Sequence, residues 1–64
     1  MCQTSAFVEK DGSEEMMLEN VTSLEVLDNG LRIATLFEGS QDYPGLAIRK
    51  IDFAGGKLFL FRSE

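Results

Sequence analysis

The sequence predicts a small all-β domain, either a meander or a barrel, formed as one unit by residues 1–64. Between its turns lie short runs rich in Val, Ile, Leu and Phe, residue types that favour strands. Close and regular spacing of turns and short strands is typical of small meanders and barrels. The turn signals are KDGS at 10–13, DNG at 28–30, DYPG at 42–45 and AGGK at 54–57.

The first predicted hairpin joins SAFVEK at 5–10 to SEEMMLEN at 13–20 across Asp11-Gly12. A helix is the alternative for the second segment, because Ser13 followed by two glutamates could cap one. Only about seven residues remain before Val21, which is short for a helix without tertiary support. We therefore predict a strand for this segment.

The second predicted hairpin is SLEVLDNGLRIATLF at 23–37. Asn29-Gly30 suits a type I′ turn, in which both central residues need a positive φ. The register that follows pairs Val26 with Ile33 and Leu24 with Thr35 on one face, and Glu25 with Ala34 and Leu27 with Arg32 on the other.

The last predicted hairpin is IRKIDFAGGKLFLFR at 48–62, with Gly55-Gly56 at its turn. Its register places Phe53 opposite Leu58 and Ile51 opposite Leu60, and puts Lys50, Asp52, Phe59 and Phe61 on the other face. Before this hairpin, Pro44-Gly45 fits the two central positions of a type II turn.

The formal charge of −5 is unevenly distributed. Residues 1–32 carry seven acids against two bases, whereas residues 33–64 carry four of each. An acidic chain repels phosphate at long range, so we do not expect nucleic acid as a partner.

No apolar run approaches the roughly 18 residues of a membrane span, so no membrane association is expected. One unpaired cysteine argues against an oxidising compartment, and we expect a cytoplasmic protein.

Cys2 is the only cysteine, and the chain has no histidine. It could be a small hydrophobic residue at a frayed terminus. Glutamine amidotransferases also begin with MC and use that cysteine as a nucleophile, but they need a large sandwich fold. This chain also lacks a histidine for a Cys–His pair, so we do not expect an enzyme. Lipid attachment would need a signal segment, which we do not find.

Metal chelation is the remaining interpretation of Cys2. If Met1 is removed, the amine and thiolate of Cys2 can close a five-membered ring on one ion. If Met1 is retained, its amine, the deprotonated Cys2 amide and the Cys2 thiolate form two fused five-membered rings in a plane. Nitrogen and thiolate donors in a flat arrangement suit Ni(II) or Cu(II) better than tetrahedral Zn(II). One terminus supplies only two or three donors, whereas two chains around a twofold axis would supply four.

The opening MCQ and the segment TLFEGSQDYPGLAIRKIDFAGGKLFLF at 35–61 resemble the CooT family of small nickel-binding proteins. The similarity extends over nearly the whole chain. It implies a six- to seven-stranded Sm/SH3-like barrel, a homodimer, and Cys2 as the Ni(II) ligand. It further implies an accessory protein, a metallochaperone, whose client is the nickel-containing carbon monoxide dehydrogenase.

The last predicted strand, KLFLF at 57–61, is apolar on both faces. Leu58 and Leu60 can line a barrel, which leaves Phe59 and Phe61 as candidates for a dimer interface. The alternative function is an RNA- or protein-binding small barrel without a metal role. RNA binding needs exposed aromatic rings and a basic surface, which these phenylalanines could form with nearby bases. These bases are Arg49, Lys50, Lys57 and Arg62.

Overall fold

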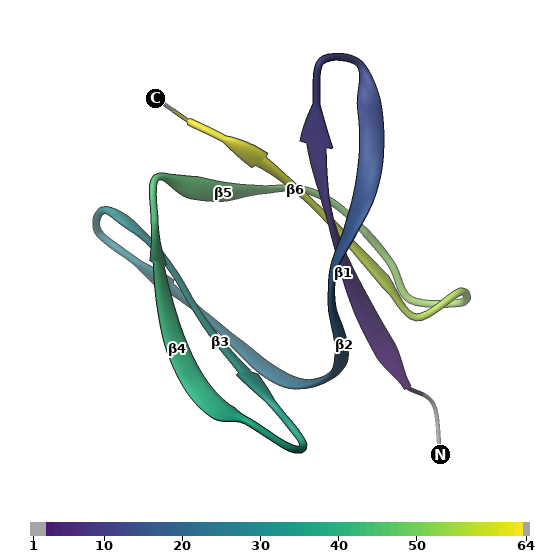
Figure 1. Ribbon diagram of the computed structural model, residues 1–64, viewed down its shortest axis with the longest axis vertical. Helices are drawn as coiled ribbons and strands as arrows, with labels where there is room; N and C mark the ends of the chain where they lie inside the picture. The colour runs from purple at the N-terminus through teal and green to yellow at the C-terminus, as the bar shows by residue number, and fades with distance from the viewer. Residues whose placement is uncertain (1–2, 64) are drawn as a thin grey trace.

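The computed structural model describes residues 3–63, which form one six-stranded sheet of order β4-β3-β2-β1-β6-β5. The sheet curls into a half-barrel (Figure 1). The all-β class and the six strands are therefore confirmed. No helix occurs between residues 3 and 63, so none there could cross a membrane. The strands are β1 (Thr4–Lys10), β2 (Ser13–Leu27), β3 (Gly30–Thr35), β4 (Gly39–Pro44), β5 (Leu46–Asp52) and β6 (Lys57–Arg62).

The first and last strands lie side by side in the middle of the sheet. β1 to β4 are antiparallel neighbours in chain order, whereas β6 runs parallel to β1. In this parallel pair Ser5 lies opposite Lys57, and Val8 lies opposite Leu60. The start of β1 therefore lies beside the turn that joins β5 to β6.

The first predicted hairpin is confirmed. Lys10 pairs with Ser13, and Asp11 and Gly12 have φ values of +54° and +80°, as a type I′ turn requires. The segment SEEMMLEN is the first half of the 15-residue strand β2. Asn20 has φ of +58°, close to the point where pairing of β2 passes from β1 to β3.

The second hairpin forms, but its predicted register is wrong by two residues. Leu27 pairs with Gly30 and Leu24 with Ile33, so the two turn residues are Asp28 and Asn29. Gly30 serves a different purpose: a Cβ there would lie 2.3 Å from the Tyr43 carbonyl oxygen of β4. The even shift leaves every side chain on its predicted face. The pairs Val26–Ile33, Leu24–Thr35, Glu25–Ala34 and Leu27–Arg32 are replaced by pairs two residues away.

The last hairpin also forms with a shift of two residues. Ile51 lies opposite Leu58, so the predicted pairs Phe53–Leu58 and Ile51–Leu60 are wrong. The loop is longer than predicted, since Asp52 pairs with Lys57, and within it the Asp52 carboxylate accepts a hydrogen bond of 3.0 Å from the Gly55 amide. Lys50 lies opposite Phe59, so the predicted outer face is retained.

The core lies on the concave face of the sheet. Leu58 and Leu60 belong to it, as predicted, and Leu60 is fully buried. Gly45, with φ of +84°, has the positive φ that the predicted Pro44-Gly45 turn needs. Its amide donates to the Asn29 carbonyl and its carbonyl accepts from the Ser63 amide, each at 2.8 Å. The β4–β5 corner is thus joined to the β2–β3 turn and to the end of β6. The buried apolar residues are Ala6, Leu31, Ile33, Leu46, Leu58 and Leu60.

Candidate functional site

The candidate metal ligand Cys2 lies outside the described residues, so the site is approached from the segment that follows it. The Ser5 amide donates a hydrogen bond of 2.9 Å to the Gly56 carbonyl. A Cβ at Gly56 would lie 2.7 Å from the Gln3 carbonyl oxygen, and Gly56 has φ of +66°. The β5–β6 turn therefore packs closely against Gln3 and the first residues of β1.

Within residues 3–63, no three His, Cys, Asp or Glu side chains gather closely enough to hold a metal ion. Four acidic residues of this range form ion pairs with arginines at two places on the sheet. The predicted ligand, Cys2, lies outside that range.

One of the two ion-pair groups crosses β2, β3 and β4. Arg32 donates to Asp42, with a distance of 2.7 Å from Nε to Oδ1, and its Nη1 lies 3.6 Å from Glu25 Oε1. The hydrogen bond from Arg32 holds the pKa of the Asp42 carboxyl below its ordinary value. Both side chains are solvent-exposed, so this pair supports the edge strand and forms no enclosed charged site.

The convex face carries a stacked pair of aromatic rings that the sequence did not reveal. Phe7 and Phe59 lie with ring centroids 5.7 Å apart and planes 24° apart. Lys50 Nζ lies 5.4 Å from the Phe59 centroid, and Lys57 Nζ lies 5.9 Å from the Phe7 centroid. The parallel pairing of β1 with β6 creates this cluster from the two ends of the chain.

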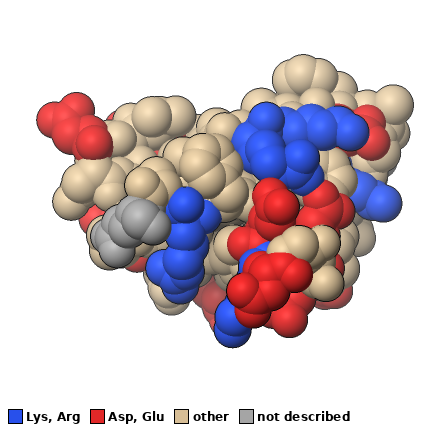
Figure 2. Space-filling view, turned by 90° about the horizontal axis from the view of Figure 1, so that it is seen from above, with Lys and Arg blue, Asp and Glu red and all other residues tan. Residues whose placement is uncertain are grey.

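Phe59 is partly covered by its own chain. Besides Phe7 and Lys50, the guanidinium carbon of Arg49 lies 5.6 Å from its ring centroid. Arg49 also pairs with Glu9 and Glu14, which neutralise its charge locally. Figure 2 shows basic and acidic side chains lying next to one another on the end that carries the β1–β2 turn. The predicted gathering of Phe59 with basic residues is therefore present, but acids are interleaved with it.

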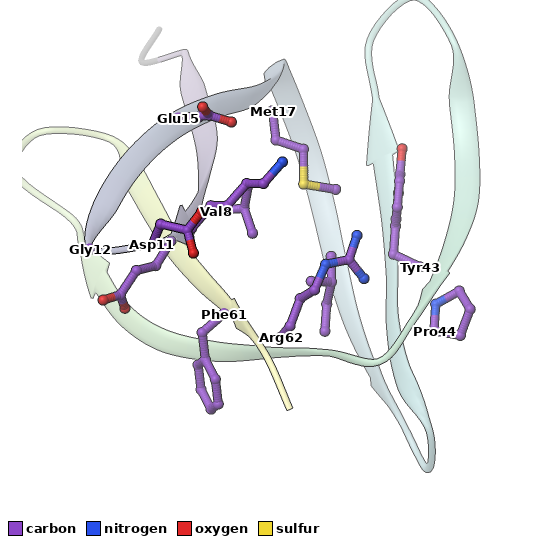
Figure 3. Close-up of a pocket in the computed structure, with 12 residues that line it drawn as sticks. Val8, Asp11, Gly12, Glu15, Met17, Tyr43, Pro44, Phe61 and Arg62 are labelled. Carbon is purple, nitrogen blue, oxygen red and sulfur yellow. The ribbon is translucent and has the colours of Figure 1, made fainter. Parts of the chain in front are cut away.

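A groove of about 990 Å³ opens between the β1–β2 hairpin, the end of β4 and β6. Its apolar wall includes Val8, Met17 and Tyr43. Figure 3 shows Arg62 pointing into the space that these side chains surround, whereas the Phe61 ring points away from it. Phe61 thus lies on the convex side, as predicted, and is half-buried. The groove lies at the far end of β1 from Thr4, because the residues of β1 that line it are the last three, Val8, Glu9 and Lys10.

Residues 1–61 match the family model described as CO dehydrogenase accessory protein CooT. The chain is also similar to a crystal structure described as a CooT protein from Carboxydothermus hydrogenoformans. That similarity has a TM-score of 0.83 and 25% sequence identity, and covers 98% of this chain and 100% of the other. No curated protein matches the chain.

Proposed function

Since the chain belongs to the CooT family of CO dehydrogenase accessory proteins, we propose that it binds Ni(II) through Cys2 and supplies it to carbon monoxide dehydrogenase. An accessory protein is not a catalyst, which agrees with the expectation that this chain is not an enzyme. The family match, which extends through the opening residues and so includes Cys2, is the observation that carries this proposal.

The chemistry of Cys2 supports nickel as the cargo. Its thiolate is the chain's only sulfur donor of that kind, and no imidazole competes with it because the chain has no histidine. Thiolate with amine or amide nitrogen favours Ni(II) over the harder cations. The free thiol and amine have pKa values of about 8.5 and 7.7–8.0, so metal binding must displace protons and weaken at acid pH.

We further propose that two chains share the ion in a homodimer. One terminus offers too few donors for four-coordinate Ni(II), and a second Cys2 would complete the set. Phe59 is two residues along β6 from Lys57, the partner of Ser5, so an interface centred on Phe59 would border the start of β1. Saturation at one nickel per two chains is the expected stoichiometry.

Nickel titration followed by absorption spectroscopy tests the ligand. The wild-type chain should develop thiolate-to-nickel charge-transfer bands, and Cys2→Ser should abolish them. A matched control is Cys2→Ser combined with Ser40→Cys, which keeps one thiol per chain at an exposed position of β4. The displaced thiol should not restore the bands. Residues appended before Met1 should weaken binding, because they move the terminal amine away. Undiminished nickel binding by Cys2→Ser would remove the assignment.

A further inference from the structure

Two turns of the sheet present bulky apolar side chains to solvent. In the β3–β4 turn at 36–38, Leu36 is 65% exposed and Phe37 is 80% exposed. In the β5–β6 turn at 53–56, Phe53 is 86% exposed. Single exposed apolar side chains are ordinary on a protein surface, but a group of them at one site marks an interaction surface.

The register of the sheet brings both turns to the start of β1. Thr4 of β1 pairs with Val21 of β2, and Val21 pairs with Thr35, the last residue before the β3–β4 turn. On the other side of β1, the Ser5 amide bonds to Gly56 in the β5–β6 turn. In Figure 1 the start of β1 accordingly lies between the two turns. The exposed apolar side chains thus flank the segment that leads to Cys2.

Both turns are held in place by side-chain hydrogen bonds. The hydroxyl of Thr35, a buried residue, accepts a bond of 3.2 Å from the Glu38 amide. The Asp52 carboxylate accepts one of 3.0 Å from the Gly55 amide. These bonds restrain the turns that carry Phe37 and Phe53 before any partner binds, which lowers the entropy lost on binding.

We propose that Leu36, Phe37 and Phe53 form a handover surface that docks on an apolar patch of the nickel-accepting enzyme. This inference rests on the proposed function, because it takes Cys2 as the donor of the metal. Cys2 is joined to Gln3, with about 3.8 Å between neighbouring Cα atoms. An acceptor that approaches the start of β1 to receive the metal would therefore meet the two flanking turns.

The size of the handover surface favours a transient acceptor over a second copy of this chain. A stable interface buries about 800 Å² on each partner. A buried aromatic side chain contributes about 150–250 Å², so Phe37 and Phe53 together supply about half of that area. Such a surface suits an encounter that must end once the metal has moved.

The test measures the affinity of this chain for nickel-free carbon monoxide dehydrogenase. Each variant is made in the Cys2→Ser background, so that docking is measured without metal binding. Phe37→Ser combined with Phe53→Ser should weaken the complex at least about tenfold. The matched control is Val26→Ser, which removes a 69% exposed apolar side chain beside the β2–β3 turn, opposite Leu31. The control should change the affinity less than about twofold.

Several outcomes would overturn the handover surface. These are no binding to the enzyme, unchanged affinity in the double variant, or an equal loss with Val26→Ser. Sedimentation of the double variant without the enzyme reports its oligomeric state. A change in that state would also overturn the proposal, because the surface would then contact a second copy of this chain. Circular dichroism checks that the variants fold. Failure of the proposed function can be told apart from failure of the docking proposal. In the first case Cys2→Ser would still bind nickel, and the measured affinity for the enzyme would not change.

Discussion

Replacing Gly56 by Ala tests whether the β5–β6 turn holds the start of β1. Gly56 has φ of +66°, and its added Cβ would lie 2.7 Å from the Gln3 carbonyl oxygen. Gly39 is a matched control, because it has φ of +74° and its added Cβ would meet nothing within 4 Å. Both substitutions force a side chain into the left-handed region, but only Gly56→Ala also requires the backbone at Gln3 to move.

The two contributions can be separated by size. A Cβ in the left-handed region costs about 1–2 kcal/mol, which is the whole expected loss for Gly39→Ala. Forcing extra volume into a filled site costs a further 1–3 kcal/mol or so, which gives about 2–5 kcal/mol for Gly56→Ala. Equilibrium unfolding in urea measures both losses. Hydrogen exchange of the Ser5 amide, which donates to Gly56, should quicken relative to the global rate only in Gly56→Ala.

Nickel affinity provides a second measurement for the same pair of variants. If the turn positions the segment that leads to Cys2, Gly56→Ala should bind nickel more weakly than Gly39→Ala does. Equal losses of stability in the two variants, with unchanged exchange at Ser5, would refute the close packing of the turn against Gln3.

Four further results are expected. Leu60→Ala, at a fully buried core position, should lower the free energy of unfolding by about 2–5 kcal/mol, and a loss under 1 kcal/mol or so would contradict the concave core. The Asp42 carboxyl should titrate by NMR below the ordinary aspartate pKa, and Arg32→Gln should raise that midpoint. Because the folded-state pKa is lowered, the stability from this pair is present above the unfolded-state pKa and lost as pH falls through the folded-state value; Asp42→Asn should therefore reduce acid sensitivity. A short single-stranded RNA should bind weakly at physiological salt, and tight, salt-dependent binding would instead support the RNA-binding alternative. Phe59→Glu should lower the dimer population and the nickel affinity together, whereas a monomeric wild-type chain that binds one nickel would reject the shared site.

The features predicted correctly from the sequence are those that neighbouring residues determine. Asp11-Gly12 closes a turn because both residues tolerate a positive φ, and the alternation of Leu58 and Leu60 with Phe59 fixes which face each occupies. Strand register is less predictable, because a glycine in the sequence can mark either a turn that needs a positive φ or a position where a neighbouring strand lies too close for a side chain. Gly30 is of the second kind, because the backbone of β4 packs against it. β4 is distant from Gly30 in the sequence, so a local pattern does not predict this contact.

The parallel pairing of β1 with β6 could not be predicted from local patterns either. It joins the two ends of the chain, and no turn residue signals it. For this reason the stack of Phe7 on Phe59 was missed, although the cations around Phe59 were anticipated. The same pairing places the β5–β6 turn beside the start of β1, so the neighbourhood of the candidate metal ligand emerged only from the topology.

Native mass spectrometry of the nickel-loaded chain tests the central claim most directly. It reports in one spectrum whether Met1 is present, how many chains associate and how many nickel ions they hold. The proposed function predicts one nickel per two chains for the wild type and none for Cys2→Ser. A Cys2→Ser chain that retains nickel at the wild-type ratio would contradict it.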